Sequence, residues 1–130
     1  MTIGINYSVV RFRPNRVLDE FANIGVVSID VSNGHVCYAI GADAIDKIRR
    51  FFPSCDKVLI VEAINIVVGD LSRLTKMSTH NNHNNMISAF NHAVSVREGI
   101  VFFSDKRSAI TELDLSSYTK KLCDEYVDNK

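Results

Sequence analysis

The stretch ANIGVVSIDVSNGHVCYAI, residues 22–40, decides the fold of this chain. Its first part, residues 22–31, is rich in β-branched side chains, which favour a strand. Gly25 within this run predicts a bulge or a close approach of another backbone. Ser-Asn-Gly at residues 32–34 predicts a tight turn, because Asn-Gly adopts positive φ angles easily. Residues 35–40 then return as a second strand, which must run antiparallel to the first across so short a turn.

The residues on either side of this hairpin extend the prediction. Residues 5–13 carry apolar side chains in loose alternation, which predicts another strand. Pro14 ends that strand, because proline cannot donate a hydrogen bond to a ladder. After the hairpin the apolar period changes to that of a helix. Asp43 is placed to cap a short helix over residues 44–52, and Pro53 stops it.

The second half of the chain predicts two longer helices and a fourth strand. A helix fits residues 55–76, where one apolar stripe recurs at spacings of three or four: Ile60, Ile64, Val67, Leu71 and Leu74. The polar run at residues 78–85 predicts a loop. Helical spacing resumes at residues 86–95, and residues 100–104, IVFFS, predict the strand.

A last helix completes the predicted order of elements. Thr111 and Asp114 resemble a capping box that opens it, and apolar residues supply its buried face: Leu115, Tyr118, Leu122 and Tyr126. The order of strands and helices predicts a single α+β domain over residues 1–130. We expect a small, mainly antiparallel sheet of about four strands, with the helices packed on one face.

Composition and charge exclude several classes of protein. The 130 residues carry 15 basic and 15 acidic side chains, and 46% of the residues are hydrophobic. These values are typical of a globular domain, and they argue against a disordered chain or a DNA-coating protein. The three cysteines lie far apart with no Cys-x-x-Cys pair, which predicts reduced thiols. We find neither a secretory signal nor an apolar run that could span a bilayer, so we expect a cytoplasmic location and no membrane contact.

Three segments resemble a known bacterial family. They are YSVVRFRP at residues 7–14, EFANIGVVSID at residues 20–30 and REGIVFFS at residues 97–104. Together they resemble the bacterial domain of unknown function 3037 family over most of the chain. Ser28 stands where this resemblance leads us to expect an apolar residue. The resemblance implies a fold and no catalytic residues, and it hints at a partner, because members are sometimes encoded beside kinase-like proteins of the toxin–antitoxin type.

Three arginines close together in sequence form the main candidate site. Arg11 and Arg13 lie two positions apart on a predicted strand and therefore share one face, and Arg16 follows the break after the strand. Grouped guanidinium forks bind phosphates or carboxylates through paired hydrogen bonds. The alternative is that they pair with nearby acidic residues on a solvated face, where such pairs contribute little. Glu20 and Asn23 either line a pocket beside the arginines, or Glu20 neutralises an arginine and Asn23 caps a turn.

The sequence predicts neither a metal site nor a cofactor. His80, His83 and His92 could reach one ion, but no carboxylate or cysteine accompanies the pair in the loop, which favours a solvated loop. Cys55, near the start of a predicted helix, could form a thiolate, although burial as a small apolar residue is the commoner role. The six isolated glycines form no phosphate-binding loop, and no catalytic signature is found.

These observations favour a non-enzymatic protein-interaction or regulatory module. We expect the strand edge at residues 11–16, with residues 20–25, to contact another protein, and a free sheet edge would also permit self-association. The family resemblance alone suggests a toxin–antitoxin or phage–host conflict setting. The alternative is a nucleic-acid or nucleotide binder that uses the same arginines on phosphates. An enzyme with an unfamiliar site is a third interpretation.

Overall fold

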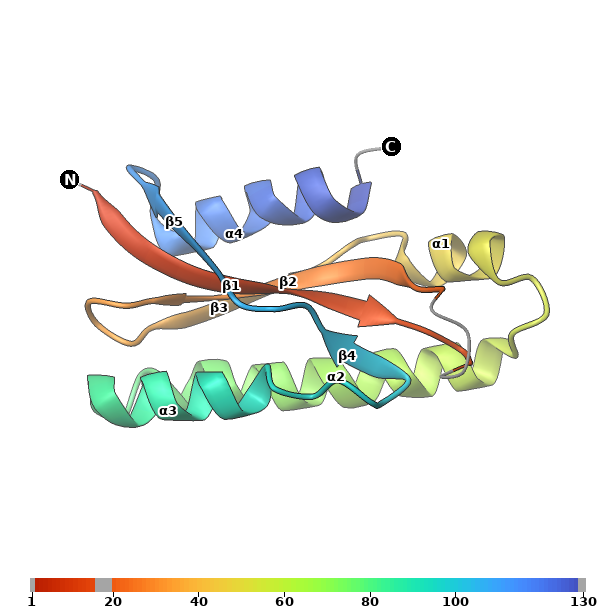
Figure 1. The fold of residues 1–130 in the computed structure, drawn as a ribbon, viewed down its shortest axis with the longest axis horizontal. Helices are drawn as coiled ribbons and strands as arrows, with labels where there is room; N and C mark the ends of the chain where they lie inside the picture. The colour runs from red at the N-terminus through yellow and green to blue at the C-terminus, as the bar shows by residue number, and fades with distance from the viewer. Residues whose placement is uncertain (1, 16–19, 129–130) are drawn as a thin grey trace.

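A computed structural model describes residues 2–15 and 20–128 of the chain (Figure 1). It consists of one antiparallel sheet with helices on both of its faces. In chain order the elements are β1 (Ile3–Phe12), β2 (Ala22–Asp30), β3 (Val36–Ile40), α1 (Ala44–Phe51), α2 (Lys57–Met77), α3 (His83–Ala93), β4 (Val101–Phe103), β5 (Arg107–Thr111), α4 (Leu115–Cys123) and a π-helical extension η1 (Asp124–Asp128). The α+β class and the antiparallel sheet are as the sequence predicts.

The first strand lies in the middle of the sheet. The strand order is β3-β2-β1-β4, and β5 also pairs with β1. On its outer side β1 pairs with β5 along residues 3–7 and with β4 along residues 10–12. The prediction of a strand edge at residues 11–16 is therefore wrong at Arg11, which has a neighbouring strand on both sides.

The hairpin of β2 and β3 forms as predicted. Gly34 takes a φ of 79° in the turn, a value that glycine adopts without strain. The register between β1 and β2 shifts beside Gly25, because Val10 pairs with Gly25 and Arg11 with Asn23. A Cβ on Gly25 would lie 2.6 Å from the carbonyl oxygen of Ala39, so another backbone does approach this glycine closely. Both expectations for Gly25 are confirmed.

The helices cover both faces of the sheet, which corrects the prediction that they pack on one face. Figure 1 shows α2 and α3 on one side of the sheet and α4 on the other. The larger core, on the α2 side, includes Ile24, Val27 and Ile29 of β2. A second core on the α4 side includes Val26 and Tyr7. A strand that is buried on both faces has a nearly continuous apolar sequence, which is the pattern of residues 22–31.

A capping residue fixes where α2 begins, whereas the predicted cap of α1 does not form. Asp56 accepts a hydrogen bond from the backbone nitrogen of Val58 at 3.0 Å, so α2 begins at Lys57 and not at Cys55. Asp43 precedes α1, but its side chain makes no capping hydrogen bond. All five residues of the predicted α2 stripe are buried.

Two further differences lie in the second half of the chain. Asn82 accepts a hydrogen bond from the backbone nitrogen of Asn85, so α3 begins at His83 and the loop is shorter than residues 78–85. Strand β5 was not predicted, and it separates β4 from α4, which begins after the capping residue Asp114. No helix in the described part of the chain is long and apolar enough to cross a bilayer.

Candidate functional site

Arg11 and Arg13 lie on the same side of the sheet, each against the ring of a phenylalanine. The Cζ atom of Arg11 is 4.3 Å from the ring centre of Phe21, and that of Arg13 is 3.9 Å from the ring centre of Phe102. The two rings touch edge to face, with centres 5.7 Å apart and planes at 90°. Cation–π contacts of this kind contribute about 0.5–1 kcal/mol each at exposed sites. The four side chains therefore form one continuous row with a guanidinium at each end.

Neutral hydrogen-bond partners hold these two arginines in place. Arg11 on β1 lies opposite Asn23 on β2, and its Nε donates to the amide oxygen of Asn23 at 3.2 Å. The amide nitrogen of Asn23 donates in turn to the backbone carbonyl of Tyr126 in η1. Arg13 donates to two carbonyls of the loop before β4, those of Gly99 and Arg97. The structure thus places Asn23 next to Arg11, in agreement with the interpretation that Asn23 lies beside the arginines.

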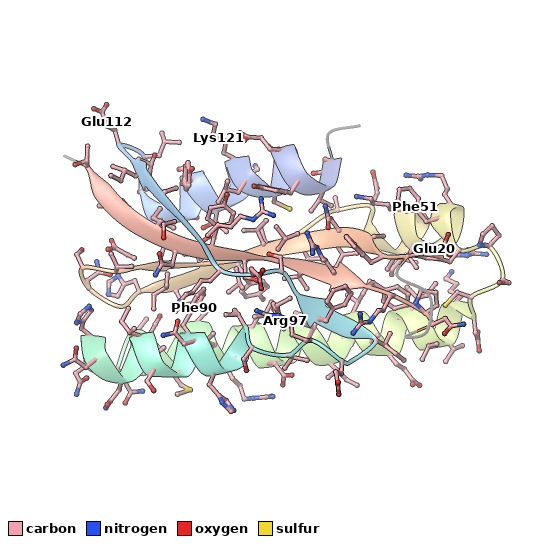
Figure 2. All side chains as sticks on the ribbon, in the orientation of Figure 1. Glu20, Phe51, Phe90, Arg97, Glu112 and Lys121 are labelled. Atoms are coloured by element: carbon pink, nitrogen blue, oxygen red, sulfur yellow. The ribbon has the colours of Figure 1, made fainter. Side chains whose placement is uncertain are left out.

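Two more arginines, absent from the sequence-based site, join them. Arg107 on β5 donates from Nη1 to the hydroxyl of Tyr126 at 3.0 Å. Arg97 pairs with Asp105 at 3.3 Å, and Figure 2 labels Arg97 near the segment that joins β4 and β5. We call the group of Arg11, Arg13, Arg97 and Arg107 the arginine surface. Its members come from both ends of the chain, and no local pattern links them.

The arginine surface is largely without neutralising charge. Among residues 2–15 and 20–128, Arg97 meets a carboxylate, whereas Arg11, Arg13 and Arg107 have none within salt-bridge distance. The alternative that these arginines pair with nearby acids is therefore not what the described residues show. Burial, followed by the positive charge of Arg107, lowers the pKa of the Arg11 guanidinium. An anionic group placed between them would relieve this repulsion.

A pair of tyrosines lies next to the arginine surface. The hydroxyls of Tyr7 and Tyr126 are 3.0 Å apart, and the two ring centres are separated by 5.9 Å. Burial and the hydrogen bond with Tyr126 raise the pKa of Tyr7 to about 12, so the phenol stays neutral at physiological pH. Tyr126 lies in the π-helical extension of α4, a rare geometry that is frequent at functional sites. The extension directs one tyrosine toward both Tyr7 and Arg107.

The remaining predicted binding residues lie elsewhere. Arg16 falls outside the described residues. Glu20 is exposed and lines a separate hollow of about 490 Å³ with residues that include Phe52 and Cys55. Figure 2 shows Glu20 near α1. The interpretation that Glu20 neutralises Arg11 or Arg13 is wrong, because no ion pair joins them.

The histidines and Cys55 form no common site in the described structure. The ring of His83 contacts the carbonyl oxygen of Val31, and His92 lines a groove beside α2. Within residues 2–15 and 20–128, no three His, Cys, Asp or Glu side chains are grouped to hold a metal ion. Burial, followed by the charge of Asp56, raises the pKa of Cys55, which disfavours a reactive thiolate.

The fold and the site together define a class of protein: a small α+β domain whose sheet lies between two helical layers and presents an arginine–aromatic surface. This chain belongs to the protein family of unknown function DUF3037, whose sequence profile matches residues 7–127. The match confirms the family resemblance and includes all four residues of the arginine surface. No curated protein and no solved structure matches the chain.

Proposed function

We propose that this chain is a non-enzymatic, cytoplasmic protein-interaction module that binds an acidic segment of another protein through the arginine surface. One observation carries the proposal. Three arginines, Arg11, Arg13 and Arg107, converge on one side of the sheet with neutral partners in the described chain. Arginine forks bind carboxylates through two parallel hydrogen bonds, so an acidic side chain is a matching ligand.

The surroundings of the surface favour a protein over a nucleic acid. The side chain of Asp105 is 96% exposed, and it already pairs with Arg97. A continuous phosphate backbone would have to pass this carboxylate, whereas a protein segment can place its acids between the arginines and avoid it. The ring of Phe21, 39% exposed, adds an apolar contact beside them. Arginine and aromatic residues are the types that dominate the energetics of protein interfaces.

The experiment compares the wild-type protein with an Arg11→Ala/Arg107→Ala variant. Binding of a fluorescent polyglutamate peptide and of a fluorescent single-stranded oligonucleotide is measured by anisotropy over a range of salt concentrations. Arg49→Ala on α1, an exposed arginine outside the surface, is the matched control. We expect the peptide to bind the wild type and the control alike. The double variant should bind at least about tenfold more weakly, because interface arginines commonly contribute more than 1 kcal/mol each.

The same titrations decide between the two functions. Oligonucleotide binding that exceeds peptide binding, and falls steeply as salt rises, would establish the nucleic-acid alternative, since each released counterion adds to the salt slope. Equal binding by the wild type and the double variant would reject the arginine surface for both ligands. A pull-down from native lysate then identifies the partner, and the double variant must fail to retain it. A regulatory role in a toxin–antitoxin or phage–host conflict setting is the corresponding biological proposal, and it rests on the family resemblance.

A further inference from the structure

The outward side of α2 carries a row of residues that the rest of the described chain leaves uncovered. The spacings alternate between three and four, which places these residues on one face of the helix: Leu59, Glu62, Ile66, Gly69 and Arg73. Ile66 is 67% exposed, and Leu59 is also an exposed apolar residue. The stripe that faces the sheet consists of different residues, so this row is a second, outward-facing seam.

Nothing in the described part of the chain requires a glycine at position 69. A Cβ at this position would meet only the end of the Arg73 side chain, at 3.8 Å. Glycine inside a helix costs about 1 kcal/mol relative to alanine, and here neither a turn nor a close internal contact requires it. Glycine does allow a second backbone to approach closely. The position is therefore suited to receive a side chain from another molecule.

We infer that two copies of this chain associate through antiparallel pairing of their α2 helices. In a contact with two-fold symmetry, if residue i of one copy meets residue j of the other, then residue j of the first copy also meets residue i of the other. The register that places Ile66 on Gly69 of the second copy packs the exposed Ile66 side chain against the open backbone at Gly69. The two-fold symmetry produces this contact twice. The same register sets Leu59 against Lys76 of the second copy, whose aliphatic stem covers the leucine while its charge stays in solvent.

Charge complementarity selects this arrangement over the others. In the antiparallel register Glu62 faces Arg73 of the second copy, and the pair occurs twice. A parallel pair would instead place Glu62 against Glu62 and Arg73 against Arg73, which is repulsive. Glu62 forms no ion pair within the described chain, and the existing pair of Arg73 with Asp70 is exposed and weak. Arg73 would therefore lie between its own Asp70 and Glu62 of the second copy.

The groove beside the seam adds apolar area to this contact. It has a volume of about 580 Å³ and lies between α2, the end of α3 and β4, with Ile66, Val96 and Ile100 among its lining. Val96 is itself an exposed apolar residue. A helix seated along α2 would cover the α2 side of this groove. Arg11 and Arg107 lie on the α4 side of the sheet, next to Tyr126, and this inference does not depend on the proposed function.

The test measures mass in solution with charge-reversed variants. Sedimentation equilibrium of the wild type should show a mass that rises with concentration from 14.6 kDa toward twice that value. Glu62→Lys and Arg73→Glu should each weaken the dimer by about tenfold or more, because each creates two like-charge contacts. An equimolar mixture of the two variants restores both attractive pairs and should form a heterodimer with wild-type affinity. Arg49→Glu, an exposed reversal on α1, should leave the dimer unchanged.

The outcomes that overturn the inference are distinct from loss of folding. Circular dichroism establishes first that each variant retains the wild-type helix content. A wild type that stays at 14.6 kDa up to about millimolar concentration would refute the dimer. A dimer that both single variants retain, or that their mixture does not restore, would assign the contact to another face.

Discussion

The Ser28→Ala substitution is expected to stabilise the protein, although it removes a polar group from the sheet. Ser28 is 0% exposed on β2, where it pairs with Tyr7 on one side and Cys37 on the other. Its hydroxyl has no hydrogen-bond partner among residues 2–15 and 20–128. A buried hydroxyl without a partner costs about 1–3 kcal/mol, and alanine removes that single oxygen. After a small loss of packing contact, we expect the free energy of unfolding to rise by about 1 kcal/mol.

Ser8→Ala is the matched control, because the same atom is removed from an equally buried site on the neighbouring strand. Ser8 is also 0% exposed, but its hydroxyl donates to the carbonyl oxygen of Ser104 at 2.7 Å. Deleting this bond leaves the carbonyl with one partner fewer. We expect the free energy of unfolding to fall by about 1–2 kcal/mol. The opposite signs of the two substitutions isolate the hydrogen bond as the cause.

Urea denaturation and thermal melts of the three proteins measure the difference. For a chain of this length, 1 kcal/mol corresponds to a change in Tm of roughly 3–5 °C, so the two variants should lie on opposite sides of the wild type. If Ser28→Ala lowers the Tm as Ser8→Ala does, the reasoning is refuted, and the Ser28 hydroxyl must have a partner such as a buried water.

Four further predictions concern backbone space and titration. Gly25→Ala should destabilise by more than about 3 kcal/mol, because its Cβ would lie 2.6 Å from the carbonyl oxygen of Ala39. Gly69→Ala, measured at concentrations where the protein is monomeric, should instead raise the free energy of unfolding by about 1 kcal/mol. Calorimetry that finds the same change in stability for both glycine variants would contradict both predictions. The pKa of Tyr7 rises from 10.0 to about 12 on folding, so the folded state holds this proton more tightly. The associated stability is full below pH 10 and is lost as the pH rises toward 12, and Tyr7→Phe should flatten that loss in urea titrations at alkaline pH. Burial also raises the pKa of the Cys123 thiol to about 11, so an aromatic disulfide reagent should modify it only on unfolding, and rapid reaction of the native protein would count against this.

The parts of the fold that the sequence predicted are those with local signals. The hairpin follows from an Asn-Gly turn between two β-branched runs, and the core stripe of α2 follows from helical spacing alone. Strand β5 has no such signal, because most of its residues are exposed and partly polar. Its place is fixed by pairing with β1, from the other end of the chain. Likewise, the apolar run of β2 indicates burial but does not tell which helix covers which face.

The residues of the candidate site also fall into those that local sequence predicts and those that it does not. Arg11 and Asn23 belong to strands that adjoin in sequence, so their contact could be predicted. Arg97 and Arg107 reach the site through β4 and β5, and their membership required the sheet topology. The expected strand edge at Arg11 failed for the same reason, because the strand that pairs with Arg11 on the outer side of β1 is β4, which lies far along the chain.

The central position of β1 also sets the order in which the molecule can be completed during synthesis. This strand is synthesised before the partners on its outer side, β4 and β5, which follow β2, β3 and three helices along the chain. Pairing across so long a stretch of chain is slow, and until it happens one edge of a strongly apolar strand is open. The arginine surface is assembled by that same pairing. A partner that binds the arginine surface would therefore bind only those chains in which β4 and β5 have already paired with β1.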